Sequence, residues 1–451
     1  MILVKSERRL SRLGWRALSA LLIGLLFFIA LPAGAQGQEY LLLEVEGPVT
    51  PAMASYFERA IEEARADGAQ AVLILLNTPG GAVDVTLDIV QTFRNAPVPV
   101  IVYIGPAGAQ AASAGSIITA AAHASAMAPE TVIGAAAPVD GSGADIGETL
   151  LLKITEDLKA TMRNLTERRG EEAVELAEAM IEEARAVTAG EALDAGLIDA
   201  VAEDVPDLVE QLDGLPIVVD DDEVILQLGG AVERSLPMNG VERLLHALAN
   251  PLLIGLLMTI GVQAILIEIS NPGGWVAGFI GVLCLGMALY GLGTLPANWL
   301  GLGLIIVAFV LLAFEVSTPS TGALGIVGAL TFFAGLLVLF NSPGTPEFAR
   351  ISIAGAIGIT LFTTGFFLFL ITKALRAQKV VPLTGTEGMI GQIGPVKLAL
   401  RPANDEAGSF DGSVLVNGEL WRASSDEAIS SGDRVVVKAV DGFTLRVKKV
   451  A

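Results

Sequence analysis

Hydrophobic residues follow three different patterns along the chain, and each pattern predicts a different kind of structure. Residues 39–201 alternate short apolar runs with amphipathic segments, which is typical of a mostly parallel α/β sheet. We expect strands at 39–47, 71–77 and 98–104, helices at 51–66, 84–95 and within 147–186, and a helix and short strand within 188–201. Residues 381–451 alternate apolar and polar positions between turn residues, which predicts about five short strands in a small barrel of the OB type.

The middle of the chain contains five apolar stretches, each close to the roughly 20 residues that a membrane-spanning helix needs. Glu268 and Glu315 lie at two matching junctions, and each is followed by Pro at +4 and by Gly at +10 and +13. A duplicated helical hairpin accounts for this match. The two carboxylates either serve transport or close turns at the membrane surface, and the neighbouring proline and glycine favour turns. The five stretches are residues 250–269, 275–294, 298–316, 322–341 and 351–373.

The N-terminus has the features of a secretory signal. Basic residues precede the apolar segment 17–31, and Ala33-Gly34-Ala35 matches a cleavage site. We expect cleavage after Ala35 and export of the domain that follows. An uncleaved membrane anchor is the alternative interpretation of the same segment.

The distribution of basic residues predicts how the chain crosses the membrane. If the signal exports the α/β domain, five spans place the C-terminus in the cytoplasm, and Lys373, Arg376 and Lys379 directly follow the fifth span. The loops 296–298 and 342–350 carry one basic residue, as expected outside. The sequence thus predicts an integral protein of the cell (inner) membrane with four parts: a signal peptide (1–35), an extracytoplasmic α/β domain (36–246), a membrane domain of five helices (247–375) and a cytoplasmic OB-like barrel (381–451).

Composition supports a membrane protein and argues against some functions. The 451 residues are 53% hydrophobic with a mean hydropathy of +0.63. Residues 36–246 carry 36 Asp or Glu against 11 Lys or Arg, a balance of −25 that argues against binding a phosphate backbone. The barrel has few aromatic residues beyond Phe410, Trp421 and Phe443, which favours a protein partner over nucleic acid. The single cysteine, Cys284, excludes an intrachain disulfide and a cysteine metal cluster.

Candidate chemistry lies where two predicted strands end. The segment QAASAGS (110–116) offers Ser113 and Ser116, and NTPGG (77–81) follows another strand. Ligand sites in parallel sheets lie at the carboxyl ends of the strands. A glycine pair can turn backbone N–H groups towards a developing oxyanion. The alternative is that these residues have structural roles only: the glycines form a turn, and the serine caps the N-terminus of a helix.

A nucleophilic serine needs a base, and the choice is narrow. His123 follows Ser113 by ten residues on the same expected helix, nearly three turns away, and His246 precedes the first span. Burial lowers the pKa of a lysine ammonium, so that a buried lysine can accept a proton at neutral pH. Lys153 follows three leucines and has an apolar setting, whereas Lys159 lies among charged residues and is expected at the surface.

These motifs make the sequence recognisable. The chain resembles the long-form NfeD proteins, which are membrane-bound serine proteases of the ClpP class with a ClpP/crotonase-like domain. The resemblance covers nearly the whole chain. It implies Ser113 as the nucleophile, Lys153 as the general base at the start of a K-x-x-x-D-x-x-A-x-x-R helix, and backbone N–H groups of Gly80, Gly81 and Ala114 as the oxyanion hole. Its most specific carriers are LNTPGG (76–81), AASAGSIITAAAHASAMAPETVIGAAAPV (111–139) and TAGEALDAGLID (188–199).

The resemblance also implies a function. A membrane-anchored Ser–Lys endopeptidase would cleave apolar peptide segments, such as the C-terminal region of a stomatin/prohibitin-like membrane protein. It would require no metal and no organic cofactor, would contact membrane lipid, and would self-associate as a dimer or larger homo-oligomer. The chain departs from the family at GAAAPV (134–139) and RRGEE (168–172), which affects the expected substrate preference. A non-catalytic scaffold for the same partner is the alternative. A crotonase-type acyl-CoA enzyme fits poorly, because export would separate it from CoA.

Overall fold

The structure is a computed structural model that describes residues 38–139, 147–220, 222–270, 273–317, 322–378, 386–402 and 409–450. The expected signal peptide, residues 1–35, lies outside the described residues. The α/β domain and most of the membrane helices belong to one compact unit, and the C-terminal barrel belongs to a second.

A six-stranded sheet forms the centre of the α/β domain, and all of its neighbouring strands pair in parallel. This confirms the parallel α/β fold that the alternating pattern predicts. The strand β11 was not among the expected elements; it returns from the end of the domain to pair with β1. In spatial order the strands are β11 (Val232–Ser235), β1 (Glu39–Glu46), β2 (Val72–Asn77), β3 (Val100–Ile104), β5 (Ala124–Met127) and β8 (Ala200–Val201).

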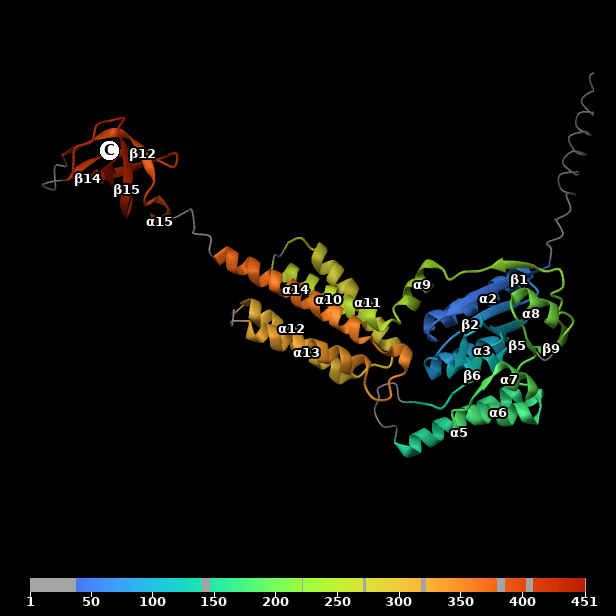
Figure 1. Cartoon of the computed structure of the whole chain (residues 1–451). Coiled ribbons are helices and arrows are strands. Elements are labelled where there is room, and N and C mark those ends of the chain that lie inside the picture. The colour runs from blue at the N-terminus through green and yellow to red at the C-terminus, as the bar shows by residue number, and fades with distance from the viewer. Residues whose placement is uncertain are drawn as a thin grey trace, which may run out of the picture. The chain divides into compact units, whose positions relative to one another are not determined.

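Side chains that alternate along the strands build two hydrophobic cores. In β1, Leu41 and Leu43 pack with the helices on one face, whereas Tyr40 and Leu42 pack on the other. The first face is covered by α2 (Pro51–Asp67), α3 (Val83–Arg94) and α4 (Ala114–Ala121) (Figure 1). The second is covered by α8 (Val205–Leu212) and the hairpin of β9 (Pro216–Val219) and β10 (Asp222–Ile225).

A second, three-stranded sheet carries the serine segment. Its order is β4 (Gln110–Ala112), β6 (Val132–Gly134) and β7 (Ala186–Thr188). Beside it, α5 (Glu148–Thr166) and α6 (Glu171–Glu182) lie against each other, and α7 (Ala189–Asp194) follows β7 (Figure 1). The expected helical region 147–186 is thus two helices, with a 3-10 turn between them at Glu167–Arg169.

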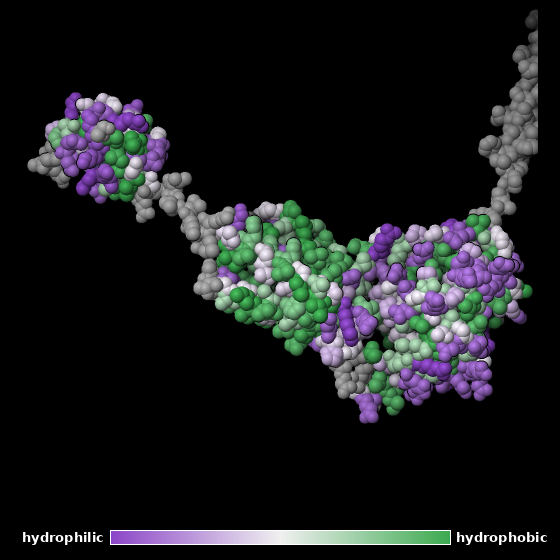
Figure 2. Space-filling view, viewed as in Figure 1, coloured by the Kyte–Doolittle hydropathy of each residue, from purple (hydrophilic) through white to green (hydrophobic). Residues whose placement is uncertain are grey.

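Among the residues that the structure describes, five helices are long and apolar enough to cross a membrane, as the sequence predicts. Apolar side chains cover their surface, whereas polar side chains predominate on the α/β domain and the barrel (Figure 2). A short helix, α9 (Gly240–Ala247), precedes the first of them. The five are α10 (Pro251–Ser270), α11 (Val276–Thr294), α12 (Trp299–Ser317), α13 (Ala323–Phe340) and α14 (Ile353–Gln378).

The packing of α10 on α11 and of α12 on α13 supports the duplication. A Cβ on Gly281 would lie 2.9 Å from the Gly261 carbonyl oxygen and 2.6 Å from Ile265. At the positions 47 residues later, a Cβ on Gly328 would lie 3.4 Å from the Ala308 carbonyl oxygen and 3.0 Å from Leu312. Both hairpins therefore use the second glycine of the repeat for close helix contact.

Glu268 closes the turn after α10. Its carboxylate accepts hydrogen bonds from the N–H groups of Gly273, Trp275 and Gly278, at 3.3, 2.9 and 3.3 Å. A carboxylate that satisfies three backbone donors at a helix junction performs a structural task. This geometry agrees with the turn that the neighbouring proline and glycine predict.

The C-terminal part is a closed five-stranded barrel, as expected. The order β12-β13-β14-β16-β15, with a parallel β14–β16 pair, matches the OB type. Phe410 and Trp421 pack against its core, while Phe443 is 89% exposed. Its elements are α15 (Thr386–Met389), β12 (Ile393–Pro402), β13 (Phe410–Val416), β14 (Glu419–Ser425), β15 (Arg434–Asp441) and β16 (Thr444–Lys449).

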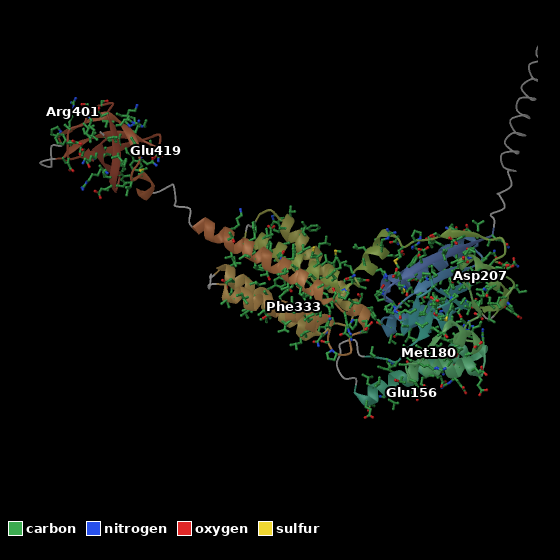
Figure 3. The ribbon with its side chains drawn as sticks, in the orientation of Figure 1. Glu156, Met180, Asp207, Phe333, Arg401 and Glu419 are labelled. Atoms are coloured by element: carbon green, nitrogen blue, oxygen red, sulfur yellow. The ribbon has the colours of Figure 1, made fainter. Side chains whose placement is uncertain are left out.

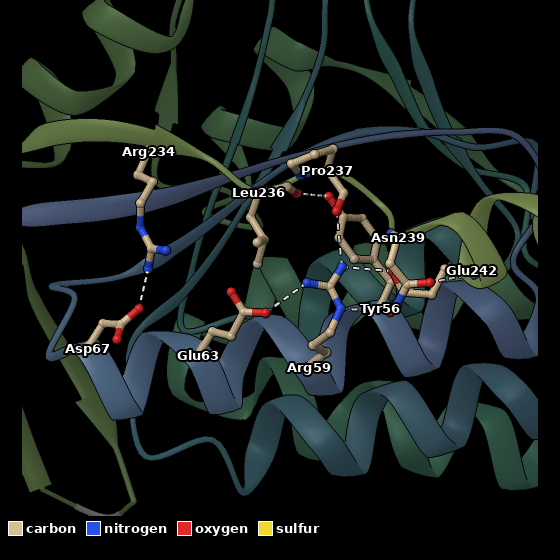
Figure 4. A network of polar contacts seen from close by, with 9 residues as sticks. All are labelled: Tyr56, Arg59, Glu63, Asp67, Arg234, Leu236, Pro237, Asn239 and Glu242. Atoms are coloured by element: carbon tan, nitrogen blue, oxygen red, sulfur yellow. Dashed lines mark hydrogen bonds and ion pairs between the residues drawn. The ribbon is translucent and has the colours of Figure 1, made fainter.

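An ion pair fixes α9 on α2. The Arg59 guanidinium donates to both carboxylate oxygens of Glu242, at 2.8 and 2.7 Å (Figure 4). Glu242 also accepts from the Asn239 N–H at 2.8 Å, and the Asn239 side chain caps α9. Hydrogen bonds from Arg59 hold the pKa of Glu242 below its usual value. The Arg59 guanidinium lies 5.3 Å from the centre of the Tyr56 ring, whose hydroxyl donates to the Leu236 carbonyl.

A histidine adds a second attachment. His246 Nδ1 lies 3.1 Å from Thr50 Oγ1, and its Nε2 lies 2.9 Å from the Glu46 carbonyl oxygen. Gly47 has a φ of +107°, and a Cβ there would lie 3.1 Å from His246 Nε2. His246, which precedes the first span in the sequence, is therefore bound to the α/β domain, and α10 begins soon after it, at Pro251.

We predict that Arg59→Met releases α9 from the α/β domain. Glu242 is 7% exposed, and removing the partner of a largely buried charge is costly. The free energy of local opening should therefore fall by about 2 kcal/mol, which raises the population of the opened segment about 30-fold. Thermolysin digestion of the full chain in detergent, followed by mass spectrometry, measures cutting between residues 236 and 250.

Arg234→Met is the matched control, because it removes partly exposed ion pairs of a neighbouring segment, one to Asp67 on the same helix and one to Glu39 on β1. Arg234 and Asp67 are 35% and 45% exposed at the side chain, and such pairs contribute roughly 1 kcal/mol or less. Equal cutting rates in the two variants would contradict the clamp role of Arg59.

Candidate active site

Ser113 occupies a strained turn between a strand and a helix. It follows β4 directly and precedes α4, with φ 53° and ψ −116°, a conformation that residues with a Cβ rarely adopt. Its N–H donates to the Gly134 carbonyl at 2.8 Å, and its side chain makes no N-cap hydrogen bond. Ser116 differs: it is buried, and its hydroxyl donates to the Ser113 carbonyl at 2.8 Å. The structure thus distinguishes the two serines: Ser113 has the strained backbone, and the Ser116 hydroxyl is engaged with the backbone.

Thr78 ties the glycine turn to the serine segment, and the sequence analysis did not identify it. Its N–H donates to the Gln110 carbonyl at 2.7 Å, and its carbonyl accepts from the Ala112 N–H at 3.0 Å. Its buried hydroxyl accepts a hydrogen bond from the Gly80 N–H at 3.1 Å. Thr78 belongs to the NTPGG motif, so its position between a strand and a glycine pair was the available signal.

Two glycines allow the turns to approach each other. A Cβ on Gly80 would lie 2.7 Å from the Ser113 Cβ, and Gly80 has a φ of +110°. A Cβ on Gly115 would lie 2.5 Å from Thr78 Cγ2. Any larger residue at either position would push the serine turn away from the end of β2.

The backbone donors near Ser113 differ from the expected set of three. The Gly80 N–H is already bonded to Thr78, so its contribution is the close approach described above rather than an oxyanion hydrogen bond. Gly81 lies beside Ser113 in one cavity. Ala114 is the first residue of α4, where a helix N–H has no intrahelical acceptor and the helix dipole favours negative charge. Of the three expected donors, Gly81 and Ala114 therefore remain.

Ser113 opens into a cavity of about 710 Å³. Among the described residues that line it, none is charged, although the domain as a whole is strongly acidic. On the α/β side the lining consists of the glycine turn, the serine segment and the residues that follow β6. This part of the lining is Pro79, Gly81, Ala82, Val83, Ala112, Ser113, Ala135, Ala137 and Val139.

The structure does not place Lys153 in the buried apolar setting that was expected. Lys153 is exposed on α5 and does not line the cavity. Leu150 and Leu152 are 57% and 61% exposed as well. The physical reason is that α5 begins to pack against the core only at Ile154, so the residues before it, 148–153, project beyond the domain. Glu156, labelled in Figure 3, lies just after this point.

The other candidate bases are engaged elsewhere. The α4 helix ends at Ala121, so His123 does not share a helix with Ser113, contrary to expectation. His123 Nδ1 accepts from the Val100 N–H at 3.0 Å, and burial, aided by Arg94, lowers its pKa to about 4. Lys159 forms ion pairs with Glu182 at 2.6 Å and Glu156 at 3.5 Å.

Three family models match this chain in succession. They are the NfeD1b N-terminal domain at residues 40–213, the NfeD integral membrane domain at 252–373, and the NfeD-like C-terminal, partner-binding domain at 386–449. Each falls within one of the structural parts described above.

Individual relatives match nearly the whole chain. The membrane-bound protease PH1510 of Pyrococcus horikoshii is 34% identical over 433 residues, which cover 94% of this chain and 96% of that protein. Membrane protein NfeD1b of Bacillus subtilis is 27% identical over 451 residues, covering 94% and 95%. A solved structure of the 1510-N membrane-bound stomatin-specific protease, a lysine-to-alanine variant with a substrate peptide, is 31% identical; it covers 47% of this chain and 97% of that one, with a TM-score of 0.44.

The five apolar helices and the similarity to PH1510 over nearly the whole chain identify a membrane-bound serine protease. The chain belongs to the NfeD family.

We predict that Thr78→Val lowers the kcat of peptide cleavage about 10-fold with little change in KM. Valine keeps the shape of threonine but leaves the Gly80 N–H without its acceptor, so the glycine turn loses its fixed orientation. Thr78→Ser keeps the hydroxyl and should stay within about threefold of the parent. Steady-state kinetics in detergent measure both variants. A Thr78→Val enzyme with the parent's kcat would contradict this role.

We predict that His123 makes the α/β domain less stable in acid. An unfolded histidine binds its proton near pH 6.5, whereas the folded one does so near pH 4, so the free energy of unfolding falls as the pH drops through that window. The cost is up to about 3 kcal/mol. Thermal unfolding followed by circular dichroism at pH 7 and pH 4.5 should show a smaller loss in His123→Gln. Identical losses in the two proteins would contradict the prediction.

Proposed function

We propose that this protein is a Ser–Lys endopeptidase that cleaves apolar peptide segments. Ser113 Oγ attacks the scissile carbonyl carbon while Lys153 Nζ takes the hydroxyl proton. The N–H groups of Gly81 and Ala114 bind the oxyanion, and the proton passes to the amine as the C–N bond breaks. Water, activated by the same lysine, then hydrolyses the acyl-serine ester. No step requires a metal or an organic cofactor.

One observation carries this proposal: the only serine on a strained strand-to-helix turn among the described residues faces an uncharged cavity in an acidic domain. A charged peptide segment would lose its hydrating water there without gaining an ion pair, whereas an apolar segment has no such desolvation cost. The cavity therefore supports an apolar substrate, and the strained turn supports a nucleophile that is exposed at the end of a strand.

Lys153 acts in this proposal only in the substrate-bound state. Its place in the second turn of α5, one residue ahead of the point where the helix packs, leaves the lysine and Leu150–Leu152 free of the core. Three exposed leucines are costly in water, and an apolar peptide that contacts them gains by covering them. Such a contact would bring Lys153 to Ser113 and desolvate its amine in one step.

The C-terminal barrel gives the proposal its partner. The matching family model describes a partner-binding domain, and the resemblance of the chain to long-form NfeD proteins points to a stomatin/prohibitin-like membrane protein. We place the α/β domain outside the cytoplasm and the barrel inside, with a homo-oligomer embedded in membrane lipid. The C-terminal region of the partner is then the candidate substrate.

The dyad predicts that Ser113→Ala and Lys153→Ala each lower kcat at least about 1,000-fold on an apolar fluorogenic peptide, because each removes a member of one catalytic unit. Lys159→Ala is the matched control. It removes the other lysine of the same helix, which forms surface ion pairs, and should stay within about threefold of the parent.

A serine-directed fluorophosphonate separates the enzyme from the scaffold alternative. The proposal predicts labelling of Ser113 and of no other serine, detected by peptide mass spectrometry. Undiminished turnover in Lys153→Ala would exclude the dyad while leaving a serine enzyme, and the lack of any reaction at Ser113 would favour the scaffold.

A further inference from the structure

The far wall of the cavity in front of Ser113 comes from the membrane domain. Two connecting segments form it: the link between α11 and α12, and the link between α13 and α14. All of these residues belong to the same compact unit as the α/β domain. The residues of this wall are Leu292, Gly293, Thr294, Leu295, Pro296, Ala297, Trp299, Gly344, Pro346 and Phe348.

Hydrogen bonds hold the two segments together. Asn298 donates from its backbone to the Leu339 carbonyl at 3.0 Å and from its side chain to Ser342 Oγ at 3.0 Å. Asn341 exchanges two bonds with the Ile351 backbone, both at 3.0 Å. The wall is therefore a bonded structure rather than two independent loops.

Packing also connects the wall to the α/β domain. The clamp of Arg59 and His246 fixes α9, and the residue that follows α9, Leu248, lies against α11. A Cβ on Gly291 would lie 2.4 Å from the Leu248 carbonyl oxygen. The last turn of α11, where the wall begins, is thus held close to the end of α9 on the α/β domain.

The chemistry of this wall is apolar and aromatic. Thr294 supplies its one hydroxyl among the described residues, and Trp299 is 64% exposed at the start of α12. The apolar helices α11 and α13 end at Thr294 and Phe340, and α12 and α14 begin at Trp299 and Ile353, so the wall lies at the ends of helices whose length matches the hydrocarbon layer. Tryptophan is enriched at the interface between membrane and water.

We infer that the membrane domain determines the specificity of cleavage, with Trp299 and Phe348 contacting the substrate opposite Ser113. The peptide recognised is an apolar segment that lies next to a membrane span, because the cavity has one wall on the α/β domain and the other at the membrane surface. This inference rests on the proposed function and adds to it a recognition surface outside the α/β domain.

The test measures peptide preference in the full chain reconstituted in liposomes. We use an apolar fluorogenic octapeptide and a set of variants of it with one glutamate at each position in turn. Trp299→Ala should raise KM for the apolar peptide about 10-fold and change kcat little, since it removes a large apolar contact. Trp299→Arg should improve cleavage of at least one glutamate peptide, relative to the apolar one, by about fivefold or more.

Trp275→Arg is the matched control. Trp275 is also an exposed tryptophan at a helix start, 81% exposed, but it lies at the opposite end of α11 from the cavity, about 28 Å away along the helix. Its substitution should leave both KM and peptide preference unchanged. If Trp275→Arg changes peptide preference as much as Trp299→Arg does, the effect comes from any positive charge added to the membrane domain, and the inference is overturned.

Fluorophosphonate labelling of Ser113 distinguishes the possible failures. Normal labelling in the Trp299 variants with unchanged KM and preference overturns the inference and leaves the proposed function intact. Loss of labelling in Trp299→Ala also overturns it, because the residue would then support the fold of the site rather than bind substrate. A parent protein that does not react at Ser113 contradicts the proposed function itself.

Discussion

The strained turn at Ser113 is the constraint on which the rest of the site depends. A residue with a Cβ holds a positive φ only where its surroundings impose it. Here the Gly134 carbonyl fixes the serine N–H, and Thr78 joins the ends of β2 and β4 by two backbone hydrogen bonds. Gly80 and Gly115 remove the side chains that would prevent this approach. Since β2 and β4 belong to different sheets, these bonds hold the ends of the two sheets together, and the turn between them presents the hydroxyl.

Much of this could be predicted from the sequence, because the deciding signals are local. Apolar runs such as 71–77 have a length and a turn boundary that only a buried strand explains, and the five long stretches are too apolar for a soluble helix. The parallel sheet, the five helices and the barrel are confirmed. The glycine pair directly follows β2, and chain direction alone places it at the carboxyl edge of the parallel sheet. Ser113 follows β4, a strand of the second sheet that the sequence did not predict.

Other features depend on contacts that no local pattern encodes. The end of α4 at Ala121, which separates His123 from Ser113, depends on where β5 pairs with β3. The apolar residues before Lys153 indicate burial in the sequence, yet helix α5 packs only beyond them. The bond from Gly80 to Thr78, and the membrane segments opposite Ser113, are long-range or depend on side-chain orientation. In each case the residue type indicated a role, but the sequence did not show which residue it contacts.

Proteolysis by this mechanism requires that Lys153, which is exposed and outside the cavity lining, meets Ser113 when an apolar ligand occupies the cavity. A structure of the full-length protein in lipid, with an apolar peptidyl phosphonate bound to Ser113, tests this most directly. The account predicts Lys153 Nζ within about 3 Å of Ser113 Oγ and the phosphoryl oxygen bonded to the Gly81 and Ala114 N–H groups. A phosphonate bound to Ser113 while Lys153 remains in solvent would contradict it.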